Sequence, residues 1–556
     1  MACEERVREL LDIFEAPGAC AAELLCDRHP AEAVAFTIVQ ADLSHKDLTY
    51  GELREKSTAF AAALHGLGVR PGDAVATLMG KSEDLIIALL GIWRRGAVDV
   101  PLFTAFAADA IAFRLNATGS KLVICDVDQR RKLVPAGEVP SDATPLVVVA
   151  HGEALGYDLS FSGLLSGNRA AGDTDSPEAV AVGGNGTLVQ LFTSGTTGEP
   201  KGVPIPLRSV ASFIAYQEFA LDVQPDDVFW NAADPGWAYG LYFAILAPLA
   251  TGTRSILLQG GFSAERTWQI FDRFKVTNFA AAPTVYRSLR AGSAAGAGHR
   301  LRRASSAGEP LTPDVITWSK EALGLAVRDQ YGQTEHGMVV GNAWREELQA
   351  PLREGSMGTS LPGWSADILD PLEDIVAPAG TAGRVAIEVA KSPLMWFTGY
   401  AGAAEKTADR YTADGRWYLT GDAGRKDEDG FIYFSARDDD VIIMAGYRIG
   451  PFDVESVLAQ HPDVVECAAV GAPDEIRGEV LEAYVVLREG VGGSGELAEE
   501  LQRLVKTKLA AHAYPRRIHF VDHLPKTPSG KVQRFILRRE RAAEAAAGTA
   551  AGDIAK

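Results

Sequence analysis

The sequence is poor in cysteine and in long uncharged stretches. Only five of its 556 residues are cysteine, and no pair has Cys-x-x-Cys spacing, which argues against a structural zinc site or a disulfide framework. A long uncharged stretch, 235–253, is interrupted by glycine and proline, so we expect it to line a core rather than span a membrane. The start, MACEERVREL, lacks the basic and apolar regions of a signal peptide. These absences favour a cytoplasmic chain with reduced thiols and no membrane segment.

Positive charge is also in short supply. The formal net charge is −19, which argues against a general nucleic-acid binder. Yet eleven Lys or Arg and two Asp or Glu fall between Arg503 and Arg541. Such a basic segment on an acidic chain indicates either a local anion site or a solvated face, and charge alone leaves both open.

The first part of the chain alternates helix-like and strand-like segments. Residues 57–68, STAFAAALHGLG, have helical spacing and end at a glycine, whereas 145–150 and 187–192 are short runs typical of buried strands. Residues 151–186 are rich in Gly, Ser and Asp and are expected to be a loop. The alternation predicts a large α/β body over residues 1–436, and the chain length suggests that it has several subdomains, at about 150 residues each.

The pattern changes near residue 437. A charged run and a short apolar run precede GPFDVESVLAQHP, in which Pro451 suits the first turn of a helix. The runs VVECAAV and VLEAYVVL then read as two strands. These features predict a small, separate α+β domain over residues 437–556, with a flexible tail from about residue 541.

The segment TSGTTGEPKG, residues 193–202, follows a strand-like run. Its glycines allow the backbone to approach a ligand closely, and its hydroxyls and free N–H groups are donors that suit a polyphosphate. It lacks the spacing of a Walker A loop. A flexible surface turn is the alternative for this segment taken alone.

Six motifs in order resemble those of the adenylate-forming superfamily: TSGTTGEPKG, SSAGEP (305–310), YGQTEHG (331–337), YLTGD (418–422), RDDDVIIMAGYRI (437–449) and PKTPSGK (525–531). The chain is most similar to medium-chain acyl-CoA synthetases. This resemblance implies an AMP-forming acid:CoA ligase that uses ATP, Mg²⁺ and CoA. The acid and ATP would give acyl-AMP and pyrophosphate, and the acyl group would then pass to CoA on a mobile C-terminal domain.

The resemblance also implies the nucleotide site. The family positions for ATP or AMP correspond to Thr193, Ser194, Gly195, Thr196, Thr197, Lys201, Gly308, Glu309, Pro310, Asp329, Gln330, Tyr331, Gly332, Gln333, Thr334, Asp422 and Arg437. Asp422 would bond the ribose hydroxyls. The segment 308–310 and Tyr331 would enclose the adenine.

The implied catalytic residues are Lys531, Thr196 and Glu335. Lys531 would bridge the acid carboxylate and the α-phosphate, and Glu335 would hold Mg²⁺. A lone Glu or a Lys in a PSGK turn is otherwise an ordinary exposed residue. For the second half-reaction, Asp439 matches the hinge between domain poses, and Gly446, Tyr447 and Arg448 would line the path of CoA.

The family positions of the acyl pocket correspond to Trp237, Ala238, Tyr239, Gly240, Ala307 and Gly332. Synthetases specific for acetate carry a tryptophan where Gly332 stands. Its absence favours short-to-medium chain acids, because each additional buried CH₂ contributes about 0.8 kcal/mol. On this interpretation, Gly332→Trp would shift preference toward acetate.

The sequence also allows other functions. An aryl-CoA ligase for benzoate-like acids or a ligase that loads a carrier-protein thiol would use the same motifs, and a non-catalytic nucleotide-binding protein could keep the fold. We expect small-molecule partners, no nucleic acid and no membrane, and a monomer or homo-oligomer. A lysine acetyltransferase and deacetylase acting on Lys531 would be possible further partners, because acetylation removes its charge.

Overall fold

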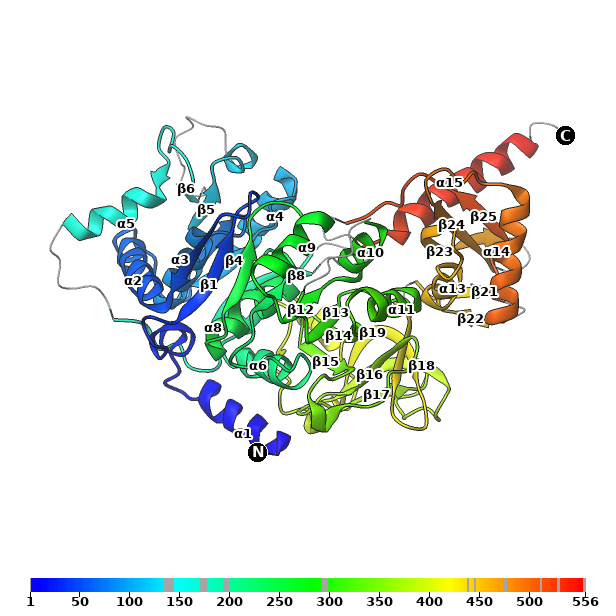
Figure 1. The fold of residues 1–556 in the computed structure, drawn as a ribbon, viewed down its shortest axis with the longest axis horizontal. Coiled ribbons are helices and arrows are strands. Elements are labelled where there is room, and N and C mark those ends of the chain that lie inside the picture. Colours follow the sequence, from blue (N-terminus) through cyan, green and yellow to red (C-terminus); the bar gives the residue numbers. More distant parts are fainter. Residues whose placement is uncertain are drawn as a thin grey trace.

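The structure, a computed structural model, describes residues 2–133, 145–170, 178–193, 200–292, 299–437, 440–444, 447–474, 478–510, 513–527 and 531–553. Within these residues the strands form three sheets (Figure 1). Two sheets build a large body, and the third forms a smaller body near the C-terminus. None of the described helices combines the length and apolar character that crossing a membrane requires.

The first sheet has the strand order β7-β6-β5-β3-β4-β8-β9, and its pairs are parallel except for the antiparallel pair β8 and β9. The two runs predicted as buried strands, 145–150 and 187–192, are confirmed as β6 and β8. The strands are β3 (Ala74–Leu78), β4 (Val98–Pro101), β5 (Leu122–Asp126), β6 (Leu146–Ala150), β7 (Leu159–Ser160), β8 (Thr187–Thr193) and β9 (Lys201–Pro206).

The helices around this sheet begin at residues that the sequence marks. In α2, Thr49 accepts a bond from the backbone N–H of Glu52 and its own N–H donates to the Glu52 carboxylate, a reciprocal cap that starts the helix ahead of the predicted segment. The helices are α1 (Cys3–Phe14), η1 (Glu23–Asp27), α2 (Tyr50–Gly66), α3 (Glu83–Arg94), α4 (Ala108–Thr118), η2 (Arg130–Lys132) and α5 (Phe161–Ala170).

The expectation of a loop over residues 151–186 is wrong in part, because this stretch contains β7 and α5. Phe161 is fully buried with its ring centroid 4.7 Å from that of Phe60. One buried aromatic residue therefore anchors a helix whose small and polar residues resemble a loop in the sequence.

The second and largest sheet has the order β17-β18-β19-β20-β16-β15-β14-β13-β12-β10-β11-β1-β2. Its run from β1 to β14 is parallel, and antiparallel strands extend both ends. The strands are β1 (Val34–Val39), β2 (His45–Thr49), β10 (Phe229–Asn231), β11 (Ser255–Leu258), β12 (Asn278–Ala281), β13 (Arg303–Ala307), β14 (Arg328–Gln333), β15 (Gly337–Gly341), β16 (Ser356–Ser360), β17 (Ala366–Leu369), β18 (Ala382–Glu388), β19 (Trp417–Lys426) and β20 (Ile432–Arg437).

Helices from the middle of the chain pack between and around the two large sheets. They are α6 (Ser209–Phe219), α7 (Ala238–Gly240), η3 (Leu241–Leu246), α8 (Ala247–Thr251), α9 (Ala264–Arg273), α10 (Pro283–Ala291), α11 (Pro313–Ala322), η4 (Glu346–Leu348), η5 (Val389–Lys391) and α12 (Ala404–Ala408). The uncharged stretch 235–253 supplies α7, η3 and α8. Residues 241–247 are buried, as predicted for a core segment.

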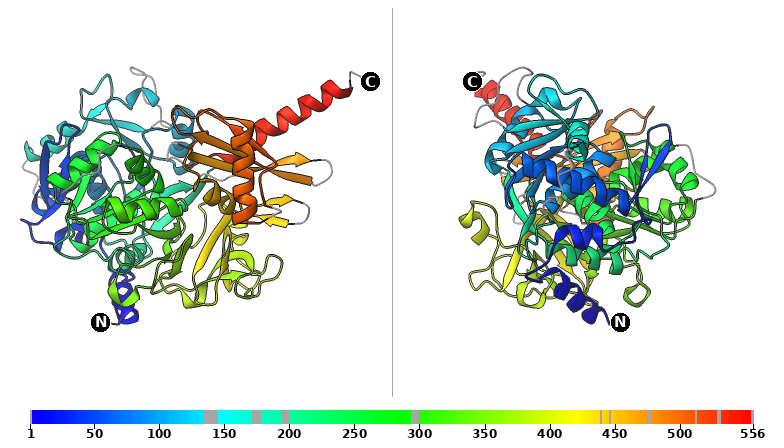
Figure 2. Two further views of the ribbon diagram at one scale, coloured as in Figure 1. Left: turned by 45° about the vertical axis from the view of Figure 1, so that its right-hand side comes forward. Right: turned by 90° about the vertical axis from the view of Figure 1, so that its left-hand side faces the viewer.

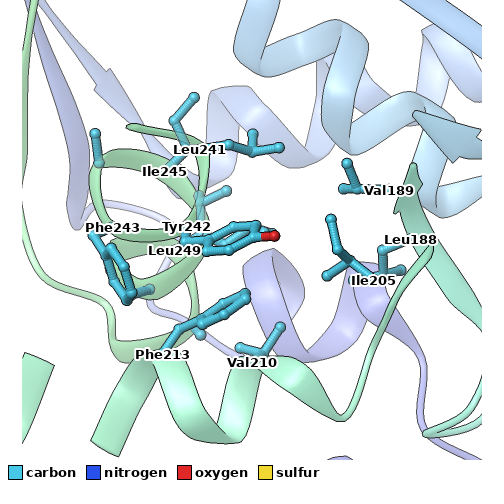
Figure 3. Close-up of a cluster of buried hydrophobic side chains, with 14 of the residues drawn as sticks. Leu188, Val189, Ile205, Val210, Phe213, Leu241, Tyr242, Phe243, Ile245 and Leu249 are labelled. Carbon is cyan, nitrogen blue, oxygen red and sulfur yellow. The ribbon is translucent and has the colours of Figure 1, made fainter. Parts of the chain in front are cut away.

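Figure 3 shows how this core is assembled. Phe213 of α6 stacks on Tyr242 of η3, with ring centroids 4.2 Å apart and an interplanar angle of 14°. Side chains of β8 and β9, among them Val189 and Ile205, face the same rings. The buried Tyr242 hydroxyl donates to the backbone oxygen of Thr334, 2.9 Å away, so the core holds the loop after β14 in place.

The third sheet has the order β22-β21-β24-β23, with β25 paired to β24. The helix beginning at Pro451 and the two predicted strands are confirmed, although each strand is longer than its apolar run. The elements are β21 (Ile442–Met444), β22 (Tyr447–Ile449), α13 (Pro451–Leu458), β23 (Val464–Asp474), β24 (Gly478–Leu487), α14 (Gly495–Lys508), β25 (Arg517–Phe520) and α15 (Arg534–Asp553).

The smaller body lies beside one end of the large body, and α15 projects away from it (Figure 2). Ion pairs with its own carboxylates take up much of the basic excess near the C-terminus. Arg534 contacts Glu455, Arg541 contacts Glu482, Arg538 contacts Asp440 and Lys526 contacts Glu466. For these cations, a structural role explains the charge pattern.

Candidate active site

Several predicted site residues of the large body lie at the carboxyl ends of its parallel strands. β13 ends at Ala307 and leads into Gly308–Pro310, and β14 ends at Gln333 and leads into Thr334 and Glu335. β10 leads into the segment that contains Trp237. Ligands of open α/β sheets bind at this edge, because loops there converge from several strands.

The β8–β9 hairpin brings the two ends of the glycine-rich segment together. Thr193 pairs with Lys201 across the two strands. Ser194, Gly195, Thr196 and Thr197 lie outside the described residues. Lys201 Nζ stands 4.5 Å from the centroid of the Tyr400 ring, and burial, followed by the nearby Arg410, lowers the pKa of its ammonium.

Glu335 is buried, with 7% of its surface exposed. Its Oε1 accepts a hydrogen bond of 2.8 Å from the Tyr400 hydroxyl. No described residue donates to Oε2. Among the described residues, no group of three or more His, Cys, Asp or Glu side chains could hold a metal ion without help. One available carboxylate oxygen fits Mg²⁺, which is usually held by one or two carboxylates together with substrate phosphates and water.

Asp422 is almost fully buried in β19 and is surrounded by donors. Its Oδ2 accepts from the Tyr331 hydroxyl at 2.5 Å and from Gln333 Nε2 at 2.7 Å, and its Oδ1 accepts from Arg437 Nη1 at 3.0 Å. A carboxylate has about four acceptor positions. A ligand hydroxyl would therefore take the remaining position or replace one of these donors.

Sheet register explains why Arg437 reaches Asp422. The two residues are directly paired across β19 and β20. Gln333 also donates to the backbone oxygen of Thr420 at 2.9 Å, which ties the end of β14 to β19. Residues separated by almost one hundred positions in the sequence are thus fixed around one carboxylate.

The segment after β13 is shaped by a glycine. Gly308 has φ of +100°, and a Cβ there would lie 3.3 Å from the Trp237 ring, so a side chain would be strained and crowded. The next residue, Glu309, forms an ion pair of 2.9 Å with Arg287 of α10. Gly308 therefore allows this segment to pass close to the indole.

Two predicted nucleotide residues have buried side chains that are hydrogen-bonded within the protein. Asp329 is buried and accepts from the backbone N–H groups of Leu311 and Gln330, and burial raises its pKa to about 8. The buried Gln330 side chain donates to the backbone oxygen of Asn342. The side chains of Asp329 and Gln330 thus hold neighbouring backbone segments in place.

The residues predicted for the acyl pocket lie at the start of α7 and at the end of β13. Tyr239 is buried, and its hydroxyl is 3.1 Å from that of Tyr216, while its ring centroid is 6.2 Å from that of Trp237. Ala307 is fully buried. A Cβ on Gly240 would lie 2.0 Å from the backbone oxygen of Asp234, so this turn accepts only glycine unless the backbone moves.

The sequence suggests that Gly332 leaves open space in the acyl pocket, but in the structure backbone atoms lie close to this position. A Cβ there would lie 2.1 Å from the backbone oxygen of Gly337 and 2.7 Å from Met338 Cα. The cause is an irregularity in the β14–β15 pairing between Tyr331 and Gly332, which turns the position toward β15. A tryptophan at 332 therefore requires a shift of β15 as well as pocket space.

Lys531 is carried to the same edge by the smaller body. Its Nζ lies 5.8 Å from the centroid of the Trp237 ring, and it forms no ion pair with a described residue. Although much of Lys531 is exposed, surrounding protein atoms lower the pKa of its ammonium, with Glu309 opposing this shift.

The residues predicted for the hinge and for CoA are only partly described. Asp439 and Gly446 lie outside the described residues. Tyr447 and Arg448 form β22 and pair with Met444 and Ile443.

Sequence reasoning missed three site residues. Tyr400 touches Glu335 and Lys201, Arg410 donates to the Tyr400 hydroxyl, and Arg287 holds Glu309. Tyr400 and Arg410 come from a segment, 400–410, between two of the motifs, and α10 lies outside all of them. Only the nearness of Tyr400 and Arg410 to YLTGD could have pointed to them.

Known families and structures match nearly the whole chain. Residues 23–400 match the family described as "AMP-binding enzyme", and residues 453–531 match "AMP-binding enzyme C-terminal domain". The acetyl-coenzyme A synthetase of Bacillus subtilis is 33% identical over 92% of this chain and 89% of its own length. The mitochondrial acyl-coenzyme A synthetase ACSM3 of Rattus norvegicus is 35% identical over 91% of this chain and 86% of its own length.

Solved structures also match nearly the whole chain. A Brucella canis acyl-CoA synthetase is 43% identical with a TM-score of 0.74, covering 96% of this chain and 97% of the other. The anthranilate CoA ligase AuaEII in complex with anthranoyl-AMP is 27% identical with a TM-score of 0.84, covering 95% of this chain and 98% of the other. The predicted α/β class, with a large body and a smaller C-terminal one, is confirmed. The chain thus belongs to the AMP-binding enzyme family and is an AMP-forming acid–CoA ligase that uses ATP, Mg²⁺ and CoA.

Proposed function

We propose that this ligase activates a short-to-medium chain carboxylic acid and that the residues gathered at the strand ends carry out the activation. The observation that carries the proposal is the convergence of Lys201, Glu335, Asp422 and Lys531 on one edge of the large sheet. Two lysines supply positive charge for anionic reactants. Two buried carboxylates supply a metal ligand and an acceptor for hydroxyls.

The reaction joins two anions, so charge neutralisation is the first requirement. The segment 193–202, including Thr196, holds the triphosphate through hydroxyls, backbone N–H groups and Lys201. Lys531 lies between the acid carboxylate and the α-phosphate. As the carboxylate oxygen bonds to phosphorus and pyrophosphate leaves, these groups stabilise the negative charge that develops.

Glu335 would be the protein ligand of Mg²⁺. When bound, Mg²⁺ neutralises phosphate oxygens and orients the triphosphate. The chain contributes Glu335 Oε2, which no described residue occupies. The Tyr400 bond to Oε1 limits rotation of the carboxylate.

The nucleoside occupies the space bounded by β13, β14 and β19. Asp422 accepts from the ribose hydroxyls, and Arg437, already paired with it, reaches the ribose or the α-phosphate. Gly308, Glu309 and Pro310 pack on one side of the adenine, and Tyr331 packs on the other. Asp329, Gln330, Gly332, Gln333 and Thr334 complete the wall, the first two through their backbone.

The smaller body acts in both half-reactions. Residues 437–556 form a mobile domain that turns about Asp439 after the adenylate forms. Lys531 then withdraws, and Gly446, Tyr447 and Arg448 approach the acyl carbonyl and line the path of the CoA thiol. The thiolate displaces AMP and gives the thioester.

The acid lies against Trp237, Ala238, Tyr239, Gly240 and Ala307, next to Gly332. These walls are mainly apolar and aromatic, which favours an aliphatic chain over acetate by a few kcal/mol at about 0.8 kcal/mol per CH₂. We place the preferred range at propionate or butyrate up to octanoate. The acid, ATP and CoA are the only partners that the reaction needs, and we propose that it proceeds in the cytoplasm in a monomer or homo-oligomer.

A chain-length profile tests the acid. We expect CoA-dependent AMP formation with kcat/KM for butyrate or octanoate above that for acetate and for benzoate. Benzoate exceeding every aliphatic acid tenfold would replace this proposal with an aryl-CoA ligase, and turnover only with a carrier-protein thiol would replace CoA as the acceptor. Pyrophosphate failing to appear with any acid would contradict catalysis at this site.

Lys531 is also a candidate for reversible acetylation by a lysine acetyltransferase and deacetylase. The side chain is exposed, and loss of its charge would block the first half-reaction. Mass spectrometry of protein isolated from its native cells under several growth conditions is the test. Unmodified Lys531 in all of them contradicts this regulation.

A further inference from the structure

We propose that Tyr400 is a positioning residue that fixes the carboxylate of Glu335 for the metal ion and places the ammonium of Lys201 for the triphosphate. The inference rests on the proposed function, which makes Glu335 the Mg²⁺ ligand and Lys201 a phosphate-binding residue. Neither the six motifs nor their spacing includes Tyr400.

The hydrogen bonds of Tyr400 have a fixed direction. Arg410 Nε donates to the Tyr400 hydroxyl at 3.1 Å, and that hydroxyl donates to Glu335 Oε1 at 2.8 Å. A guanidinium can only donate and a carboxylate can only accept. The phenol proton must therefore point at Glu335, and Oε1 is committed to Tyr400.

Tyr400 leaves the other oxygen of Glu335 for a metal ion. Because Oε1 is already held, Glu335 is arranged to bind through Oε2 alone. Partners that orient a metal-binding side chain in this way typically account for 10- to 100-fold in metal affinity or activity.

The ring of Tyr400 serves a second charged group. Lys201 Nζ lies 4.5 Å from its centroid, which is within the range of a cation–π contact. One side chain thus contacts both the predicted metal ligand and the predicted phosphate lysine. Their separation is set by the dimensions of one phenol.

Tyr400 is itself held rigidly. Only 5% of its surface is exposed, its backbone N–H donates to Thr407 Oγ1 at 2.9 Å, and its ring centroid is 5.1 Å from that of Phe397. Its neighbour Arg410 is anchored as well, because Nη1 donates to the backbone oxygen of Thr420 at 3.3 Å.

A glycine in the YLTGD motif makes room for this arrangement. Gly421 has φ of +72°, and a Cβ there would lie 2.7 Å from Arg410 Nη1. The glycine therefore permits Arg410 to reach the phenol. The chain of contacts runs from β19 through Arg410 and Tyr400 to Glu335.

Binding of Mn²⁺ by the full-length enzyme tests the proposal. Mn²⁺ is the probe because its binding can be followed by electron paramagnetic resonance, here with saturating α,β-methylene-ATP, which cannot form the adenylate. We expect Tyr400→Phe to weaken Mn²⁺ binding about tenfold or more, since the ring stays and only the hydroxyl is lost. The Mg²⁺ concentration for half-maximal pyrophosphate release should rise in parallel.

Tyr411→Phe is the matched control. Tyr411 also lies in this segment, and its hydroxyl donates to the backbone oxygen of Phe397 at 3.3 Å, away from Glu335. We expect Mn²⁺ affinity within twofold of wild type. Equal loss of affinity in Tyr400→Phe and Tyr411→Phe would mean that removing any hydroxyl of this segment loosens the site, and would overturn the proposal.

A third variant separates this proposal from the proposed function. Glu335→Gln should weaken Mn²⁺ binding at least as much as Tyr400→Phe. If Glu335→Gln weakens it and Tyr400→Phe, with an unchanged melting temperature, does not, the positioning role is wrong and the metal site stands. If Glu335→Gln has no effect, the metal assignment is wrong and the role of Tyr400 falls with it.

Discussion

The Lys531 ammonium lies 5.8 Å from the centroid of the Trp237 ring, although the two residues belong to different bodies of the protein. Trp237 immediately precedes the helical stretch of the large body, and Lys531 is the last residue of the PKTPSGK motif of the smaller one. This contact places the lysine beside Glu309, Glu335 and Asp422, which all act on its pKa. On the proposed function, this is the arrangement in which Lys531 would assist adenylate formation.

The lowered pKa of Lys531 predicts a pH dependence. A charged ammonium is required next to two anions, and its ordinary pKa is about 10.4. Because the folded protein lowers that value, activity should fall as pH rises through a pKa below it. The measurement is kcat/KM for ATP in acid-dependent pyrophosphate release, which reports ionisations of the free enzyme.

Lys531→Arg supplies the control for that profile. A guanidinium keeps its charge throughout this pH range. The loss of activity at high pH should therefore disappear from the pH profile, even if the overall rate is lower. If Lys531→Arg loses activity at high pH as the wild type does, the ionisation belongs to another group.

For substitutions of Gly332, the sequence and the structure predict different results. Because a Cβ at 332 would collide with the backbone of Gly337, we expect Gly332→Ala to lower kcat/KM at least tenfold for acetate, butyrate and octanoate alike. Overpacking of this kind costs about 1–3 kcal/mol, and here it displaces the loop that holds Glu335. Initial rates with each acid provide the measurement.

Gly261→Ala is the matched control, because a Cβ at Gly261 has no atom within 4 Å. It should leave the rates with all three acids unchanged. Near-normal rates with Gly332→Ala, together with a higher rate for acetate alone with Gly332→Trp, would contradict the predicted clash at position 332. They would support the interpretation that this position is open pocket space.

Asp99 predicts how stability depends on pH. It is fully buried, its Oδ1 accepts from Thr77 Oγ1 at 2.9 Å, and burial raises its pKa to about 8. The folded protein therefore holds a proton that the unfolded chain releases near pH 4. Stability from this group is complete below pH 4 and is lost as pH rises to about 8, by about 1.4 kcal/mol per pH unit.

Asp99→Asn removes that dependence, since an amide does not ionise. We expect the melting temperature of the variant relative to wild type to increase steadily from pH 5 to pH 8. A constant difference across this range would mean that Asp99 is ionised in the folded protein.

Much of the fold could be predicted from local patterns. The β-branched runs at β6 and β8 and the proline that starts α13 depend on neighbours in the sequence and are confirmed. The sequence does not reveal helix α5, because an aromatic anchor of this helix is Phe161, whose partner Phe60 lies 101 residues away. Long-range packing of this kind leaves no periodic signal.

The site residues likewise divide into those that the sequence reveals and those that only the structure reveals. Motif residues such as Glu335 and Asp422 could be named, but their partners Tyr400 and Arg410 could not, because sheet pairing and loop geometry bring them together. Gly332 is another example. Its place in a motif suggested open space, and only the β14–β15 irregularity reveals the backbone that fills it.

The most direct test of the account separates the two half-reactions in Lys531→Ala. Removing the cation that we propose to lie between the carboxylate and the α-phosphate should lower acid-dependent pyrophosphate release from ATP by about 100-fold or more. Thioester formation from supplied butyryl-AMP and CoA should stay within a few-fold of wild type. Equal loss of both half-reactions, or unchanged pyrophosphate release, would contradict the role of Lys531.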